Sequence, residues 1–192
     1  MRYFVYLFGI SPTRLDFGPI LMLRKSTVYK LIPMTTAVLL TGCGTLNNLI
    51  GDPLAPPEGA IETMRLHASG VQQFQCAIDS KGRYWRFISP KAKLYDNNGQ
   101  LVAEQGADFS FSAPDGSHLT AKIRKSSPGK TENDLKGLLF RTHSHGKSGI
   151  LTGITWIKRD NATGGIPLTT CSPSQVGMIL KVHFTATYTF YR

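Results

Sequence analysis

The chain has 192 residues and a formal net charge of +10 at pH 7. The apolar run from Leu31 to Leu40 covers about ten positions, against the roughly 20 that a membrane-spanning helix needs, so a permanent transmembrane helix is not expected there. No basic run with interleaved aromatic residues stands out, and nucleic acid is therefore not an expected partner.

The segment that ends at Cys43 resembles the signal of a bacterial lipoprotein, because Leu40-Thr41-Gly42-Cys43 is similar to a lipobox. Three cations lie between Met22 and the apolar run: Arg24, Lys25 and Lys30. On this interpretation residues 1–42 are a signal peptide, translation starts at Met22, and Cys43 carries diacylglyceryl and an acyl chain such as palmitate. Several acyl chains hold a protein firmly on a membrane. The alternative is an ordinary cysteine near the terminus.

The expected location follows from that signal. Gly44 stands where an aspartate often retains such proteins at the inner membrane, so by resemblance to enteric lipoproteins we expect the outer membrane, facing the periplasm. Without residues 1–42 the chain keeps 17 Lys and Arg against 11 Asp and Glu, a net charge of +6. This surplus favours anionic lipid, lipopolysaccharide or acidic polysaccharide as a ligand, or it is a solubilising surface.

The mature chain divides into two parts. Residues 43–60 are rich in Pro, Gly and Asn and are predicted to form a flexible tether. Residues 61–192 are enough for a single domain with a hydrophobic core.

Turn signals at 79–82, 96–99 and 114–116 divide the first half of this domain, and their glycines are spaced 17 residues apart. This is the rhythm of strand, turn and strand. In the segment 119–124 apolar and polar residues alternate, as in a half-buried strand. The strands predicted for this half are Val71–Ile78, Tyr84–Ile88, Leu101–Gln105, Phe109–Ser112 and Leu119–Arg124.

In the second half, Leu138–Thr142 and Ile150–Lys158 are rich in β-branched and aromatic residues and are predicted as strands. Phe184, Ala186, Tyr188 and Phe190 share one face of a last strand. Only 171–178 indicates a short helix. The predicted fold is therefore all-β, an antiparallel β-sandwich or barrel of eight to ten short strands.

Cys76 and Cys171 are the only cysteines besides Cys43. In an oxidising compartment such a pair is most simply a disulfide. The competing interpretation is a pair of free catalytic thiols.

His143 and His145 are the best candidates for a chemical site. Residues two apart on an extended segment point the same way, so both imidazoles could face one divalent metal ion. In the alternative, one histidine hydrogen-bonds in a Gly-rich turn and the other is solvated. The sequence cannot place the third ligand; the candidates are His67, His118, His183, Asp108 and Asp115.

Several other sites are excluded. Gly146-Lys147-Ser148 is similar to the end of a P-loop, but position 141 is Arg141 where that motif needs glycine, and no nucleotide is expected. The zinc-peptidase, esterase and thiol-redox motifs H-E-x-x-H, G-x-S-x-G and C-x-x-C are absent. A pair of catalytic carboxylates stays open but cannot be assigned.

The aromatic residues allow two interpretations. Tyr84-Trp85-Arg86-Phe87, Trp156 and Tyr188 could form a sugar-stacking platform, or Trp85, Phe87 and Trp156 could be core residues.

From Gly70 onward the chain resembles the family called domain of unknown function 3455. The similar pieces are Gly70-Val71-Gln72-x-Phe74-x-Cys76, Ala92-x-Leu94-Tyr95-Asp96-x-x-Gly99, Asp115-Gly116-Ser117, Ser144-His145 leading to Gly149, Ile157-x-Arg159, Thr163-Gly164-Gly165, Cys171 and Ala186-x-Tyr188-x-Phe190-Tyr191. The resemblance implies pairing of Cys76 with Cys171, and it makes His145 rather than His143 the family-like histidine. Lys147 departs from the small residue of relatives. No activity follows from the resemblance. Some fungal members of the family carry a dehydrogenase label, but this chain contains nothing similar to a dinucleotide-binding βαβ unit.

Together these observations predict a lipid-anchored envelope lipoprotein that is a binding or structural module rather than an enzyme. Its expected partners are the membrane, through the N-terminal lipid, and a glycan, an envelope component or a protein. No cofactor is expected. The alternative is a metal-binding protein or hydrolase centred on the His143–His145 loop, with Asp108, Asp115 or His118 as neighbours.

Overall fold

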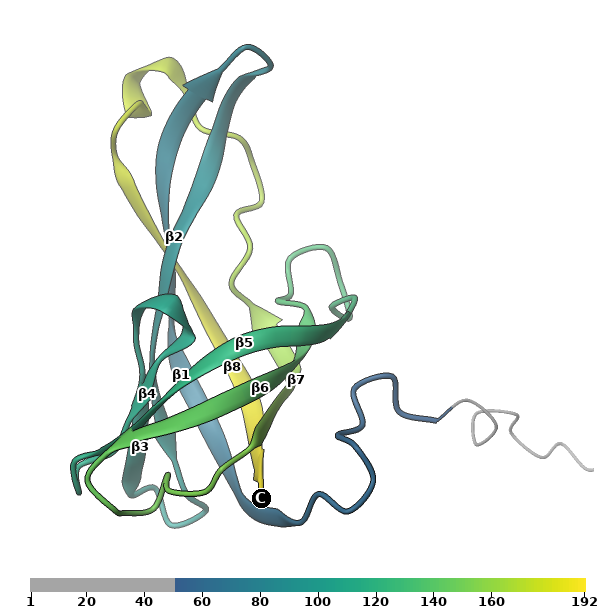
Figure 1. Ribbon diagram of the computed structural model, residues 1–192. Coiled ribbons are helices and arrows are strands. Elements are labelled where there is room, and N and C mark those ends of the chain that lie inside the picture. Colours follow the sequence, from purple (N-terminus) through teal and green to yellow (C-terminus); the bar gives the residue numbers. More distant parts are fainter. Residues whose placement is uncertain (1–50) are drawn as a thin grey trace, which may run out of the picture. The chain divides into compact units, whose positions relative to one another are not determined.

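The computed structural model describes residues 51–192, so the predicted signal peptide, Met22 and Cys43 lie outside the described residues. Within 51–192 the chain forms one closed barrel in which sequential strands pair antiparallel and the last strand pairs with the first (Figure 1). The strands are β1 (Glu62–Asp79), β2 (Gly82–Tyr95), β3 (Leu101–Gln105), β4 (Phe111–Ser112), β5 (Ser117–Ser127), β6 (Gly137–Gly146), β7 (Trp156–Gly164) and β8 (Ile179–Tyr191). Two short 3-10 helices, η2 (Ala107–Phe109) and η3 (Pro173–Gln175), interrupt them.

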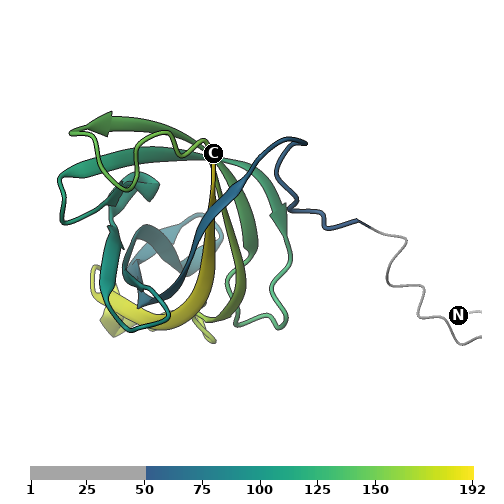
Figure 2. The ribbon, with the colours of Figure 1, turned by 90° about the horizontal axis from the view of Figure 1, so that it is seen from below.

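Alternation of apolar and polar residues produces this barrel, because every second side chain of a strand points inward. On β8, Phe184, Ala186, Tyr188 and Phe190 are all buried, as the sequence predicts. The core lies inside the ring of strands that Figure 2 shows from below. The all-β antiparallel class is confirmed, and of the two architectures expected the chain adopts the barrel.

Two predicted strands are placed differently. Of the predicted strand Phe109–Ser112, Phe109 belongs to η2 and only Phe111–Ser112 forms β4. β7 begins at Trp156, whereas Ile150–Thr155 is a turn and loop that follows β6. Leu151 and Ile154 are nonetheless fully buried, because this turn packs against the barrel core. The apolar run therefore reflects burial of a turn, and a short apolar run alone does not distinguish that from a strand.

The segment before β1 contacts the barrel. Leu54 is buried, and the carboxylate of Asp52 forms an ion pair with Lys158 at 3.1 Å. Lys125 Nζ donates a hydrogen bond to the carbonyl of Ala55 at 3.0 Å. Residues 52–55, which belong to the predicted tether, are thus fixed on the domain surface.

Three strands continue beyond the barrel. Near Gly70, β1 pairs with β2 on one side and with β8 on the other. Their neighbours stop earlier: β3 pairs only with Ala92–Tyr95 of β2, and β7 pairs with β8 only as far as Phe184. Residues 74–89 and 165–183 form the projection that results, which we call the arm. Figure 1 shows the arm at one end of the barrel and the C-terminus at the other.

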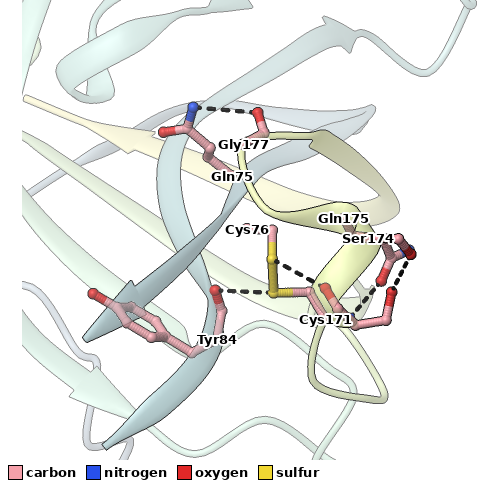
Figure 3. Close-up of a disulfide and its surroundings, with 8 residues drawn as sticks. Gln75, Cys76, Tyr84, Cys171, Ser174, Gln175 and Gly177 are labelled. Carbon is pink, nitrogen blue, oxygen red and sulfur yellow. Dashed lines mark hydrogen bonds between the residues drawn. A yellow bond between two sulfur atoms is a disulfide. The ribbon is translucent and has the colours of Figure 1, made fainter. Parts of the chain in front are cut away.

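A disulfide between Cys76 and Cys171 joins the loop of the arm to β1, with 5.9 Å between the Cα atoms, and confirms the predicted pairing (Figure 3). The backbone N–H of Gly177 donates to the carbonyl of Cys76 at 2.9 Å, and that of Cys76 donates to the carbonyl of Met178 at 3.0 Å. The short helix expected at 171–178 is η3, only three residues long.

Four phenylalanines connect the arm to the core. The ring of Phe140, inside the barrel, lies 5.3 Å from that of Phe109 in η2. Phe109 stacks on Phe87 at 6.5 Å, and Phe87 meets Phe74 edge-on at 5.8 Å. This aromatic row ties the base of the arm to the barrel.

The interior also holds polar side chains. Arg159 is buried and donates from Nε and Nη2 to the carbonyl of Lys136 at 3.3 and 3.0 Å. Tyr188 and Gln105 form a second buried hydrogen bond. In residues 51–192 no helix combines the length and apolar character required to cross a bilayer.

Candidate functional site

The two strands β5 and β6 bring three histidines together on the outside of the barrel. Their register places His118 opposite His145 and Thr120 opposite His143. All three imidazoles are exposed, because they alternate along the strands with inward-facing residues such as the buried Leu119 and Thr142. The predicted common orientation of His143 and His145 therefore holds, and His118 joins them from the neighbouring strand.

The imidazoles lie close to one another. The ring centroids of His143 and His145 are 4.5 Å apart, and those of His118 and His145 are 5.6 Å apart with nearly parallel planes. Nε2 of His145 is 3.3 Å from the hydroxyl of Thr120. Gly146 adopts a positive φ, and a side chain there would overlap the ring of His118. Glycine at this position therefore lets the His118 ring lie against the end of β6.

Next to the histidines, Lys122 stands directly opposite Arg141. Both side chains are exposed, and β5 and β6 contain no Asp or Glu. Arg141 also lies over the ring of Trp156, with 5.0 Å between the guanidinium carbon and the ring centroid. We call this surface the cationic face; it comprises His118, Lys122, Arg141, His143 and His145.

Asp115, a predicted neighbour of the histidines, lies in the turn before β5. Its carboxylate accepts hydrogen bonds from the hydroxyl and N–H of Ser117 at 2.6 and 2.9 Å and from the N–H of Ile150 at 2.7 Å. These bonds, first that of the Ser117 hydroxyl, hold the pKa of Asp115 below its usual value. The carboxylate links two loops at the edge of the cationic face.

The other predicted ligands are spread over the barrel. Asp108 lies in η2, and His67 lies on β1 with Nε2 3.2 Å from the side-chain oxygen of Asn97. His183 lies on the arm part of β8. Among the described residues no group of three His, Cys, Asp or Glu side chains is placed to hold a metal ion.

The aromatic residues also separate. Tyr188 is buried in the core, and Phe87 belongs to the aromatic row. Trp85 is half-buried and lines an open groove of about 370 Å³ with the 166–170 loop and residues 180–183 of β8. A sugar-stacking platform that combines Trp85, Trp156 and Tyr188 therefore does not form.

Sequence reasoning missed Lys122 and Arg141. The alternation in 119–124 already placed Lys122 on the outer side of its strand, but its partner depends on the register between β5 and β6. A loop of nine residues joins the two strands, so the local sequence does not determine this register.

The family model described as "Protein of unknown function (DUF3455)" matches residues 56–107 and 98–192. No curated protein and no solved structure gives a significant match to the chain.

Proposed function

The chain belongs to the DUF3455 family, and from this premise we propose that it is a lipid-anchored binding module of the bacterial envelope whose cationic face binds an acidic glycan. The family description assigns no reaction or ligand. The proposal therefore rests on the surface of this chain. It describes a binding protein rather than an enzyme.

The observation that carries the proposal is the pairing of Lys122 with Arg141. Like charges directly opposite on neighbouring strands destabilise a sheet. Here the pair lies next to three imidazoles, with no carboxylate on either strand to offset it. A bound polyanion reduces the repulsion between the two cations, and the positive potential of the face attracts such a polyanion.

The chemistry of the face suits sugar acids. Guanidinium groups bind carboxylate and phosphate with two hydrogen bonds, and the stacking on Trp156 holds that of Arg141 in one plane. Outward residues of one strand repeat at about 7 Å, which offers successive cations to a chain of repeated negative charges. A linear glycan with carboxylate or phosphate groups fits this arrangement.

The lipid anchor is supported by the sequence around Cys43 and by the disulfide, because stable disulfides belong to oxidising compartments such as the periplasm. Cys43→Ala is expected to abolish incorporation of labelled palmitate and to release the protein from the membrane fraction. Unchanged labelling in this variant would rule out the proposed anchor.

Binding is tested with polygalacturonate as the acidic glycan and dextran as the neutral one. We expect Lys122→Gln/Arg141→Gln to weaken polygalacturonate binding at least tenfold. The matched control is Lys91→Gln/Lys93→Gln, which removes two exposed charges from β2. Equal loss in both variants, or binding of dextran as strong as that of polygalacturonate, contradicts the proposal.

A divalent metal ion is the second candidate ligand, favoured by the 4.5 Å separation of the His143 and His145 rings. Two imidazoles on an exposed strand suit Zn²⁺ or Cu²⁺. Titration with Zn²⁺ of protein purified without chelator tests this, with His145→Ala as the variant and His67→Ala as the control. Absence of a bound metal that depends on His145 rejects it.

A further inference from the structure

The arm carries most of the large apolar side chains that the described residues expose. Twelve large apolar side chains in 51–192 are exposed, and eight of them belong to the arm. Those eight are Ile78, Tyr84, Phe87, Ile88, Leu168, Val176, Met178 and Ile179. Such a concentration on a folded domain marks an interaction surface.

These side chains are not confined to one face. Ile78 shares the face of Cys76, whereas Tyr84, next to the Trp85 that pairs with Cys76, points to the other side. Val176 and Met178 lie in the loop after η3, which reaches the same end of the molecule as the β1–β2 turn (Figure 1). A partner protein with a flat surface would cover one face of the arm, whereas a fluid lipid layer can surround both faces and the end of the arm.

The charged residues of the arm are mostly cationic. It contains four Lys and Arg side chains, and Asp79 is its single carboxylate. The four cations are Lys81, Arg83, Arg86 and Lys181. Apolar residues bordered by Lys and Arg are typical of segments that bind the interface of an anionic bilayer.

The end of the arm is also preformed. The disulfide and the two backbone hydrogen bonds between Cys76 and the segment 177–178 fix the loop and satisfy backbone groups close to Met178. Satisfied backbone groups lower the cost of entering a medium with little water. Little ordering is needed on binding, which favours affinity.

We propose that the end of the arm inserts into the interface of an anionic lipid bilayer. Val176, Met178, Ile78 and Tyr84 enter the boundary between headgroups and acyl chains, and the cations bind lipid phosphates. The arm projects from the end of the barrel opposite the C-terminus (Figure 1). This contact is distinct from the N-terminal lipid and from the cationic face.

The test uses the chain from residue 43 onward with Cys43→Ser, so that no acyl chain contributes. Its sedimentation is measured with vesicles of phosphatidylcholine alone and of phosphatidylcholine with phosphatidylglycerol. We expect binding to the mixed vesicles only. Val176→Ser/Met178→Ser is expected to reduce that binding at least tenfold, because both side chains are exposed and their loss leaves the fold intact.

The matched control is Ile61→Ser/Ile150→Ser, which removes two exposed isoleucines outside the arm and should bind as strongly as the parent chain. Lys122→Gln/Arg141→Gln should also retain vesicle binding, which separates this proposal from glycan binding. The proposal fails if the parent chain does not sediment with anionic vesicles or if Val176→Ser/Met178→Ser still does. Self-association that this variant abolishes, without vesicle binding by the parent, would assign the arm to a second copy instead.

Discussion

Tyr188 donates a hydrogen bond from its hydroxyl to Oε1 of Gln105, at 2.8 Å, inside the closed barrel. Both side chains are almost completely buried, and Nε2 of Gln105 has no partner among the described residues. The bond joins β8 to β3, two strands that do not pair with each other. It is therefore a polar contact across the core rather than part of the sheet.

We expect Tyr188→Phe to lower the free energy of unfolding by about 1–3 kcal/mol at neutral pH, because the carbonyl of Gln105 loses its buried donor. Urea unfolding followed by circular dichroism measures this. A Gln105→Met change in the same background should restore part of the loss, since both polar partners are then absent. Equal stability of Tyr188→Phe and the parent chain would show that the hydrogen bond contributes nothing.

The same tyrosine predicts a response to alkaline pH. Burial raises the pKa of Tyr188 above its ordinary value of 10.0. The unfolded chain therefore releases this proton at a lower pH than the folded chain. The stability contributed by the neutral phenol is complete below pH 10.0 and declines as the pH rises above that value. Tyr188→Phe should have a smaller loss of stability between pH 9 and 11 than the parent, measured by thermal unfolding.

Removal of the disulfide tests the arm as a structural unit. The bridge spans 95 residues, and in the chain-entropy model a loop of about this length contributes roughly 4–5 kcal/mol. Cys76→Ser/Cys171→Ser should lose up to this amount in urea unfolding. Hydrogen exchange should rise most in 165–178, where the bridge replaces strand pairing. Protection of 165–178 equal to that in the parent chain would contradict the assigned role.

Much of the barrel follows from local patterns. Leu101–Gln105 is a strand with the predicted bounds, and the buried face of β8 is the one that alternation indicates. Cys76 and Cys171 could be paired because the sequence leaves only two cysteines after Cys43. These features depend on neighbours in sequence or on simple counting.

The candidate surfaces depend on contacts between distant residues. His118 meets His145, and Lys122 meets Arg141, only through the register between β5 and β6, which joins residues 27 and 19 positions apart. The arm arises because β3 and β7 end before β2 and β8 do, and no local pattern encodes that difference in length. Sequence therefore identified His143 and His145 but not the surface to which they belong.

Gly70 provides a test of the close packing between β1 and β2, where it pairs with Ala92. A methyl group there would overlap the carbonyl oxygen of Lys91 and the Cα of Ala92 on β2, and both belong to the backbone. Gly70→Ala is therefore expected to destabilise the chain by about 2–4 kcal/mol, a cost typical of severe overpacking. Gly51→Ala is the matched control, because nothing lies within 4 Å of the added carbon. Similar melting temperatures for the two variants would show that the strands separate at little cost.

Asp134 is expected to account for part of the loss of folding stability at acid pH. Its carboxylate accepts hydrogen bonds from the N–H of Gly164 at 2.7 Å and from the hydroxyl and N–H of Thr131 at 2.8 and 3.1 Å. These bonds, that of Gly164 first, lower the pKa of Asp134 below its ordinary value of 3.8. Because the folded chain holds this carboxylate ionised to lower pH than the unfolded chain does, its stabilising effect is complete above pH 3.8 and disappears as the pH falls through the lowered pKa.

Asp134→Asn is expected to melt at a lower temperature than the parent at pH 7, since a neutral amide replaces an acceptor of three bonds. Below the lowered pKa the two chains should converge, because the parent is then protonated as well. Asp79→Asn is the control, with a single local hydrogen bond to Lys81 in the β1–β2 turn. A difference between Asp134→Asn and the parent that stays constant from pH 7 to pH 2 would show that the variant acts through packing and not through the charge of this carboxylate.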